Sequence, residues 1–257
     1  MSIRSVTGMI GAIFLVFLLA FPVHGETDAG DKWQFQLAPY AWLSGQKGRI
    51  ATQPGLPPSD IDLDFYDDIS DGINGAIFLV GEARKGRYGV VADIAYTDIE
   101  FDDPTPGPFY SNLNSRTKTW IISAAGFYRI VQKDHGFLDL MAGFRYWSVD
   151  ASLDFGAGIL PGVESSNKED WVDPLIGLKG LIPLGKSRFF LSGSLVAGGF
   201  KVGSNFMWDM MANLGYQWTD GFSTTIGYRY MEVDYDEDDF LYDVSQDGPV
   251  LGVSWRF

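Results

Sequence analysis

The last ten residues of the chain, GPVLGVSWRF (residues 248–257), decide the fold. Every second position counted back from the terminus is apolar: Phe257, Trp255, Val253 and Leu251. The intervening positions hold Arg256, Ser254, Gly252 and Val250. This period of two is typical of a β-strand with one apolar face and one polar or small face. The chain ends on the aromatic residue itself, with no polar tail.

The same alternation recurs along most of the chain, whereas helical periodicity is scarce. Near the start, for example, Trp33, Phe35 and Leu37 lie opposite Gln34 and Gln36. Including the terminal segment, the pattern predicts ten strands, at residues 33–44, 73–84, 87–101, 117–130, 137–149, 171–184, 188–200, 206–218, 222–235 and 248–257. The Lys85-Gly86 pair between two of them predicts a tight hairpin turn.

The predicted connections alternate between long and short, with one exception. Long connections are expected at residues 45–72, 102–116, 155–170 and 236–247, and the others are short. Long outer loops with short periplasmic turns and an even strand number are typical of bacterial membrane barrels. The connection near residues 202–205 should be an outer loop but is short, so eight or twelve strands remain open.

The first 25 residues predict a cleaved secretory signal peptide. They contain one basic residue, Arg4, an apolar run from Met9 to Phe21, and Val23 and Gly25 at positions that suit a signal peptidase. An uncleaved membrane anchor is the alternative. Cleavage would leave residues 26–257 as one barrel domain and move the net charge from −14 to −15. An acidic chain without cysteine argues against nucleic acid as a partner and against disulfide support.

Charged residues on the polar faces of the strands are balanced, although the chain as a whole is acidic. A barrel lumen requires such balance because buried charges persist only when they are paired. The predicted lumen charge network comprises Glu82, Arg84, Asp93, Arg129, Asp139, Arg145, Asp173, Lys179, Asp209, Arg229 and Arg256. The apolar faces end repeatedly in Trp or Tyr, as membrane-interface girdles do. A soluble lipocalin-like barrel, with its apolar face inside, is the alternative.

Taken together, the amphipathic strands, the signal peptide and the terminal Phe resemble the small outer-membrane β-barrel proteins of Gram-negative bacteria. The resemblance implies an all-β, closed antiparallel up-and-down transmembrane barrel. It also implies that Phe257, Trp255, Val253 and Leu251 form the signal read by the barrel-assembly machinery. The segment PYAWLSGQKG (residues 39–48) resembles the opening of an uncharacterised group of such barrels, for which no activity is implied. The expected surroundings are outer-membrane lipid and lipopolysaccharide.

The sequence offers little for catalysis. Small barrel enzymes usually pair a histidine with Ser or Asp at the outer rim. His24 belongs to the predicted signal peptide, and His135 is expected in a periplasmic turn. We therefore expect a protein that is not an enzyme and has no cofactor. A hydrolase acting on lipid or peptide, with a carboxylate site that lacks histidine, is the third reading.

Acidic stretches predict a polar outer surface that attracts divalent cations. Asp234, Asp236 and Asp238 are candidate ligands, because Ca²⁺ and Mg²⁺ prefer oxygen. The position where an EF-hand requires Gly is Asp239, and its twelfth position is Ser245, so a solvated loop is favoured over a dedicated site. We predict an envelope protein with acidic loops and a lumen largely plugged by salt bridges. A narrow pore for small solutes is the alternative.

Overall fold

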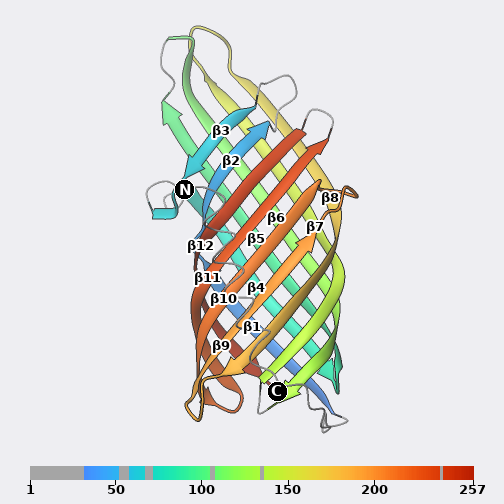
Figure 1. Ribbon diagram of the computed structural model, residues 1–257. Helices are drawn as coiled ribbons and strands as arrows, with labels where there is room; N and C mark the ends of the chain where they lie inside the picture. The colour runs from blue at the N-terminus through green and yellow to red at the C-terminus, as the bar shows by residue number, and fades with distance from the viewer. Residues whose placement is uncertain (1–31, 52–57, 67–71, 105–107, 134–135, 238–239) are drawn as a thin grey trace.

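The computed structural model is a closed antiparallel β-barrel with two further strands outside the ring (Figure 1). The structure describes residues 32–51, 58–66, 72–104, 108–133, 136–237 and 240–257. The predicted signal peptide and His135 lie outside these ranges. No helix among the described residues is long and apolar enough to cross a membrane.

Ten strands form the ring, in the order of the chain, and pairing of the first with the last closes it. They are β1 (Trp33–Trp42), β4 (Ile73–Lys85), β5 (Tyr88–Pro104), β6 (Tyr110–Lys133), β7 (Gly136–Ala157), β8 (Val163–Pro183), β9 (Phe189–Gly198), β10 (Phe206–Thr219), β11 (Phe222–Glu237) and β12 (Phe240–Arg256). The prediction of a closed ten-stranded barrel is confirmed. Eight and twelve strands in the ring are excluded.

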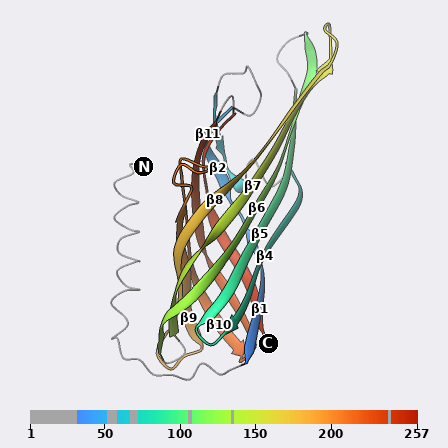
Figure 2. The ribbon, with the colours of Figure 1, turned by 90° about the vertical axis from the view of Figure 1, so that its right-hand side faces the viewer.

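The lengths of the connections and strands distinguish the two ends of the barrel, called the base and the top. At the base, where β1 begins and β12 ends, the turns are short, and Gly86 adopts the φ of 63° that a tight turn needs (Figure 1). At the top, β5–β8 rise well beyond the other strands and form a tall sheet, which we call the extension (Figure 2). On the opposite wall, β9 ends at Gly198, and seven residues lead to β10.

Three of the four predicted long loops, at residues 102–116, 155–170 and 236–247, are wrong for most of their length, because the ring strands continue into them. β6 already begins at Tyr110, β8 at Val163 and β12 at Phe240. The acidic segment 234–247 therefore belongs to the β11–β12 hairpin and not to a loop. The inward positions of this segment carry Tyr235, Phe240, Tyr242 and Val244, all buried. Apolar burial on one face overrides the acidic side chains on the other.

The two outside strands come from the predicted loop at residues 45–72. β2 (Gly45–Ala51) pairs with the upper part of β12, and β3 (Ser59–Leu63) pairs with β2. They cover an edge of β12 that β1 does not reach, since β1 pairs with β12 only from Val250 downward. An uncovered strand edge exposes unpaired backbone groups, so this pairing protects the hairpin.

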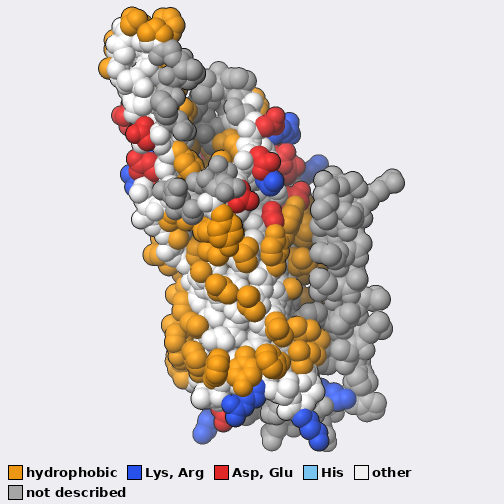
Figure 3. All heavy atoms as spheres, turned by 90° about the vertical axis from the view of Figure 1, so that its left-hand side faces the viewer, with side chains coloured by type: hydrophobic (Ala, Val, Ile, Leu, Met, Phe, Trp, Pro, Cys, Tyr) orange, Lys and Arg blue, Asp and Glu red, His pale blue; other side chains and the backbone are white. Residues whose placement is uncertain are grey.

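The outer surface of the ring carries an apolar belt bounded by aromatic side chains. Figure 3 shows the belt on the lower part of the barrel, with acidic and basic side chains above it and mainly basic ones at the base. Ring pairs such as Tyr88–Tyr128, with centroids 4.9 Å apart, lie near the base. Tyr96–Trp120, at 4.4 Å, and Trp208–Tyr230, at 4.7 Å, bound the belt above. Two aromatic girdles around an apolar band are the signature of a barrel in lipid.

Candidate functional site: the barrel lumen

Three layers of side chains cross the lumen of the barrel, and each is built from inward positions of strands far apart in the chain. Inward and outward residues alternate along every strand, so a charged inward residue lies in the lumen. There it can pair with side chains from the far wall as well as with those of neighbouring strands. The layers are called the lower, middle and upper layers, counted from the base.

The lower layer is an ion-pair chain across the lumen. Arg129 donates two hydrogen bonds to Asp139, at 2.8 and 3.0 Å. The Lys179 ammonium bridges Asp139 at 2.9 Å and Glu82 at 2.7 Å. Lys179 and Glu82 belong to β8 and β4, four places apart in the ring of ten, so the bridge spans the lumen. The same ammonium lies 3.9 Å from the centre of the Phe127 ring, which adds a cation–π contact.

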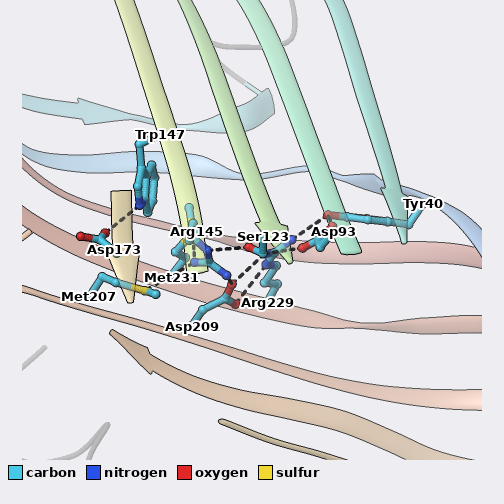
Figure 4. Close-up of polar contacts among 10 residues, drawn as sticks. All are labelled: Tyr40, Asp93, Ser123, Arg145, Trp147, Asp173, Met207, Asp209, Arg229 and Met231. Carbon is cyan, nitrogen blue, oxygen red and sulfur yellow. Dashed lines mark hydrogen bonds and ion pairs between the residues drawn. The ribbon is translucent and has the colours of Figure 1, made fainter. Parts of the chain in front are cut away.

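The middle layer joins two carboxylates to two guanidinium groups (Figure 4). Asp209 accepts from Arg145 at 2.7 Å and from Arg229 at 2.7 and 3.1 Å. Arg229 reaches across to Asp93 at 3.0 Å and donates to the Tyr40 hydroxyl at 2.7 Å. That hydroxyl in turn donates to Asp93 at 2.8 Å. All charged groups of the layer are paired, with two positive and two negative charges.

Besides its ion pair with Asp209, Arg145 contacts a hydroxyl group and two sulfur atoms. Its Nε donates to Ser123 at 2.8 Å, and its Nη1 lies 3.6 and 3.4 Å from the sulfur atoms of Met207 and Met231 (Figure 4). Both methionines are buried on the inner wall. The guanidinium therefore fits between a carboxylate, a hydroxyl and two polarisable thioethers, with almost no access to water.

The upper layer is aromatic. Trp171 stacks on Trp147, with ring centroids 5.5 Å apart, and on Tyr235 at 4.1 Å. Phe240 and Tyr242 pack against the edge of the same indole at 6.4 and 6.1 Å. These rings come from β7, β8, β11 and β12 and are all buried. Aromatic side chains of this size fill the cross-section of a small barrel.

Asp173 lies just below the aromatic layer but makes no ion pair among the described residues, contrary to the prediction. It accepts hydrogen bonds from the Trp147 indole at 2.8 Å and from the backbone N–H and hydroxyl of Ser204 at 2.6 and 2.8 Å. The Trp171 indole donates to the same hydroxyl at 2.9 Å. This buried carboxylate thus anchors the β9–β10 connection to the upper layer.

Arg84 and Arg256 also lie outside the ion-pair layers. Within the described part of the chain, neither forms an ion pair, and both face the mouth of the barrel at its base. The residues of the lumen network predicted from the sequence lie at inward positions, and ion pairing joins eight of them: Glu82, Asp93, Arg129, Asp139, Arg145, Lys179, Asp209 and Arg229. Tyr40, Trp147, Trp171 and Ser204 were missed. Trp147 and Trp171 share the inward parity of Arg145 and Asp173, and that signal could have found them.

The lower half of the barrel is hollow between these layers. A cavity of about 240 Å³ lies between the lower and middle layers, lined by Tyr40, Ser123 and Lys179 among others. A wider hollow of about 940 Å³ opens at the base. Gln36, Glu82 and Arg256 contribute to the walls of both.

Two of the three candidate cation ligands, Asp234 and Asp236, are among the described residues. Asp234 and Asp236 occupy outward positions on β11, alternating with buried Val233 and Tyr235. Asp238 lies outside the described residues. No group of three or more His, Cys, Asp or Glu side chains placed to hold a metal ion occurs in the described ranges.

No protein-family model matches the chain, and no curated protein matches it. Solved structures do. The outer-membrane protease OmpT of Escherichia coli superposes with a TM-score of 0.54 at 12% identity, over 90% of this chain and 99% of that one. The translocator domain of the autotransporter NalP from Neisseria meningitidis gives 0.50 at 13% identity, over 99% and 97%. The chain has the fold of an outer-membrane β-barrel protein.

Proposed function

We propose that the protein is a non-conducting outer-membrane barrel that carries its extension on the cell surface and performs no catalysis. The observation that supports this best is the succession of three layers across the lumen. An ion that crossed the barrel would have to displace the paired guanidinium groups of the middle layer and the stacked rings of the upper layer. Breaking a buried ion pair costs about 3–5 kcal/mol, so such openings are rare.

Location in the outer membrane is part of this proposal. It is supported by the apolar belt, by the two aromatic girdles and by the similarity of fold. The top, with its long strands and acidic side chains, then faces the outside, and the base faces the periplasm. Outward acidic residues on the hairpin and on β3 replace the predicted acidic loops, and they would meet cation-bridged lipopolysaccharide.

The test is conductance of the refolded protein in a planar bilayer, with variants that remove one layer at a time. Arg145→Ser with Asp209→Ser removes a balanced pair from the middle layer, and Trp171→Ala opens the upper layer. The wild type and each of these two variants should be silent, because one layer still closes the lumen. The combination of all three substitutions should conduct.

Folding is checked for every variant by heat-modifiability on gels. Reproducible conductance steps from the wild type would overturn the proposal. Silence from a folded combined variant would show that Arg145, Asp209 and Trp171 are not what closes the lumen.

A narrow pore is the second candidate, and the hollow lower half of the barrel favours it. The base mouth and the cavity above it already provide about 940 and 240 Å³ of space, so only the middle and upper layers separate them from the top. Conductance of the wild type would support this reading.

The absence of catalysis is tested separately. At the top, the carboxylates of Glu169 and Glu237 lie 3.0 and 3.1 Å from the Tyr235 hydroxyl and form a candidate acid–base group. Fluorogenic peptides and labelled phospholipids should remain intact with the refolded protein. Turnover that is lost in Glu169→Gln would overturn this part of the proposal.

A further inference from the structure

The mouth at the base of the barrel carries unpaired positive charge. Four cationic side chains line the hollow of about 940 Å³ and form no ion pair within the described ranges: Arg84, Lys186, Arg188 and Arg256. Among the described residues, only two acids are in its walls. One of them, Glu82, is already bound to Lys179, which leaves Asp220. The described part of the base is therefore basic, although the protein has a net charge of −14 (Figure 3).

The backbone register places two of these cations on the two strands that flank β1. Arg84 on β4 is paired with Gln34, and Arg256 on β12 is paired with Gln36. Gln34 and Gln36 are themselves part of the wall. Two guanidinium groups and two amides thus form one inward-facing row over three adjacent strands. The Arg84 side chain is oriented by hydrogen bonds to the Gln34 amide oxygen and, at 2.6 Å, to the carbonyl oxygen of Gly86.

These cations are not needed for the ion-pair layers above them, where every charged group has a partner. Like charges that converge on one mouth repel each other, and this repulsion is relieved when an anion binds between them. Guanidinium groups bind carboxylates through paired hydrogen bonds, and the amides of Gln34 and Gln36 can bond to a peptide backbone. Phe137, Phe189 and Phe190 supply apolar wall for the carbon atoms of a ligand.

We propose that the basic mouth formed by Arg84, Arg256, Gln34 and Gln36 binds an acidic peptide from the periplasmic side. The ligand docks at the mouth and does not pass through, because the middle and upper layers lie above it. Binding here is independent of whether the lumen conducts.

The experiment measures binding of a fluorescein-labelled triglutamate peptide to the refolded protein in uncharged detergent micelles, by fluorescence polarisation at low ionic strength. The double variant Arg84→Gln with Arg256→Gln should weaken binding about tenfold or more, as expected for the loss of charge-assisted hydrogen bonds. The single variant Arg84→Gln serves if the change at Arg256 disturbs assembly of the terminal strand. Increasing salt should weaken binding to the wild type.

A matched control removes the same charge at the opposite end of the barrel. Lys47→Gln with Arg49→Gln on β2 should leave the affinity unchanged. An equal loss of affinity in this control would overturn the proposal, because it would mean that only the net charge matters. Binding of labelled triglutamine as tight as that of triglutamate, or competition by inorganic phosphate as strong as by unlabelled triglutamate, would overturn an acidic peptide as the ligand class.

Discussion

Asp209 is the acceptor that holds the middle layer together, and Asp209→Asn tests whether the layer stabilises the barrel. The carboxylate is 4% exposed and accepts three hydrogen bonds from Arg145 and Arg229. The substitution preserves the shape of the side chain but leaves two buried guanidinium groups with one carboxylate, Asp93. Removal of one partner from a buried ion pair costs about 3–5 kcal/mol, and we expect the free energy of unfolding to fall by that amount.

A second substitution separates charge imbalance from loss of packing. Arg145→Met in the Asp209→Asn background removes the guanidinium that lost its carboxylate and adds a third thioether beside Met207 and Met231. The layer is then balanced again, with Arg229 bound to Asp93. The double variant should be more stable than the Asp209→Asn single variant, with a coupling energy of about 2 kcal/mol.

The assay is urea unfolding in lipid vesicles, followed by tryptophan fluorescence, with heat-modifiability as a check on folding. Asp62→Asn is the matched control, since it removes a carboxylate from an ion pair with Lys47 whose side chains are 73% and 58% exposed. An exposed pair contributes about 0–1 kcal/mol. The reasoning is refuted if Asp209→Asn costs no more than this control, or if Arg145→Met fails to restore stability.

Two further predictions concern the top of the barrel. Trp171→Ala should lower the free energy of unfolding by about 3–5 kcal/mol and remove near-ultraviolet circular dichroism from the stacked rings, because the indole contacts four aromatic neighbours; an unchanged spectrum would contradict the stacking. Asp98 lies on β5, above the Tyr96–Trp120 pair, and faces Arg116 on β6. The Arg116 guanidinium holds the pKa of Asp98 below its usual range by donating two hydrogen bonds, at 2.8 and 2.7 Å. Since the folded-state pKa is lowered, this pair stabilises the protein fully above the unfolded pKa and loses its effect as the pH falls through the folded value. In Arg116→Met the ¹³C carboxyl titration of Asp98 should move up towards about 4, and an unchanged titration would contradict the pairing.

The ring could be predicted from the sequence because its strands have two different environments. Lipid requires apolar outward residues and the enclosed lumen requires paired polar ones, so Phe144 and Arg145 on β7 report their faces directly. The extension could not be predicted this way, since both of its faces leave the membrane and its outward residues, such as Asp150, are polar. β2 and β3 are short, with two glycines in β2 and two aspartates in β3, and local preference assigns such residues to loops. Their pairing depends on the free edge of β12.

Partners across the lumen were also beyond the sequence. The alternation of polar and apolar residues predicts that Asp173 points inward. Its partners, however, depend on how far each strand is shifted along the barrel axis. The register places Arg145 directly opposite Asp173 on adjacent strands. Arg145 nevertheless binds Asp209, and Asp173 binds Ser204 from the β9–β10 connection. The shortness of that connection, visible in the sequence, allows Ser204 to be buried beside the lumen.

Ion pairs that span the lumen also explain why the ring favours closure over an open sheet. Glu82 and Lys179 come from β4 and β8, and Asp93 and Arg229 come from β5 and β11, so neither pair joins neighbouring strands. In a partly open sheet these groups are far apart, and each would lie unpaired near lipid or in water. They can pair only when the sheet has curled into a ring. Because an unpaired buried charge is costly, the lumen charges penalise open and misregistered sheets more than the closed ring. Apolar side chains of the same volume would also fill the lumen, but the inner face would then be as apolar as the face that contacts lipid. The sequence would no longer determine which face turns inward.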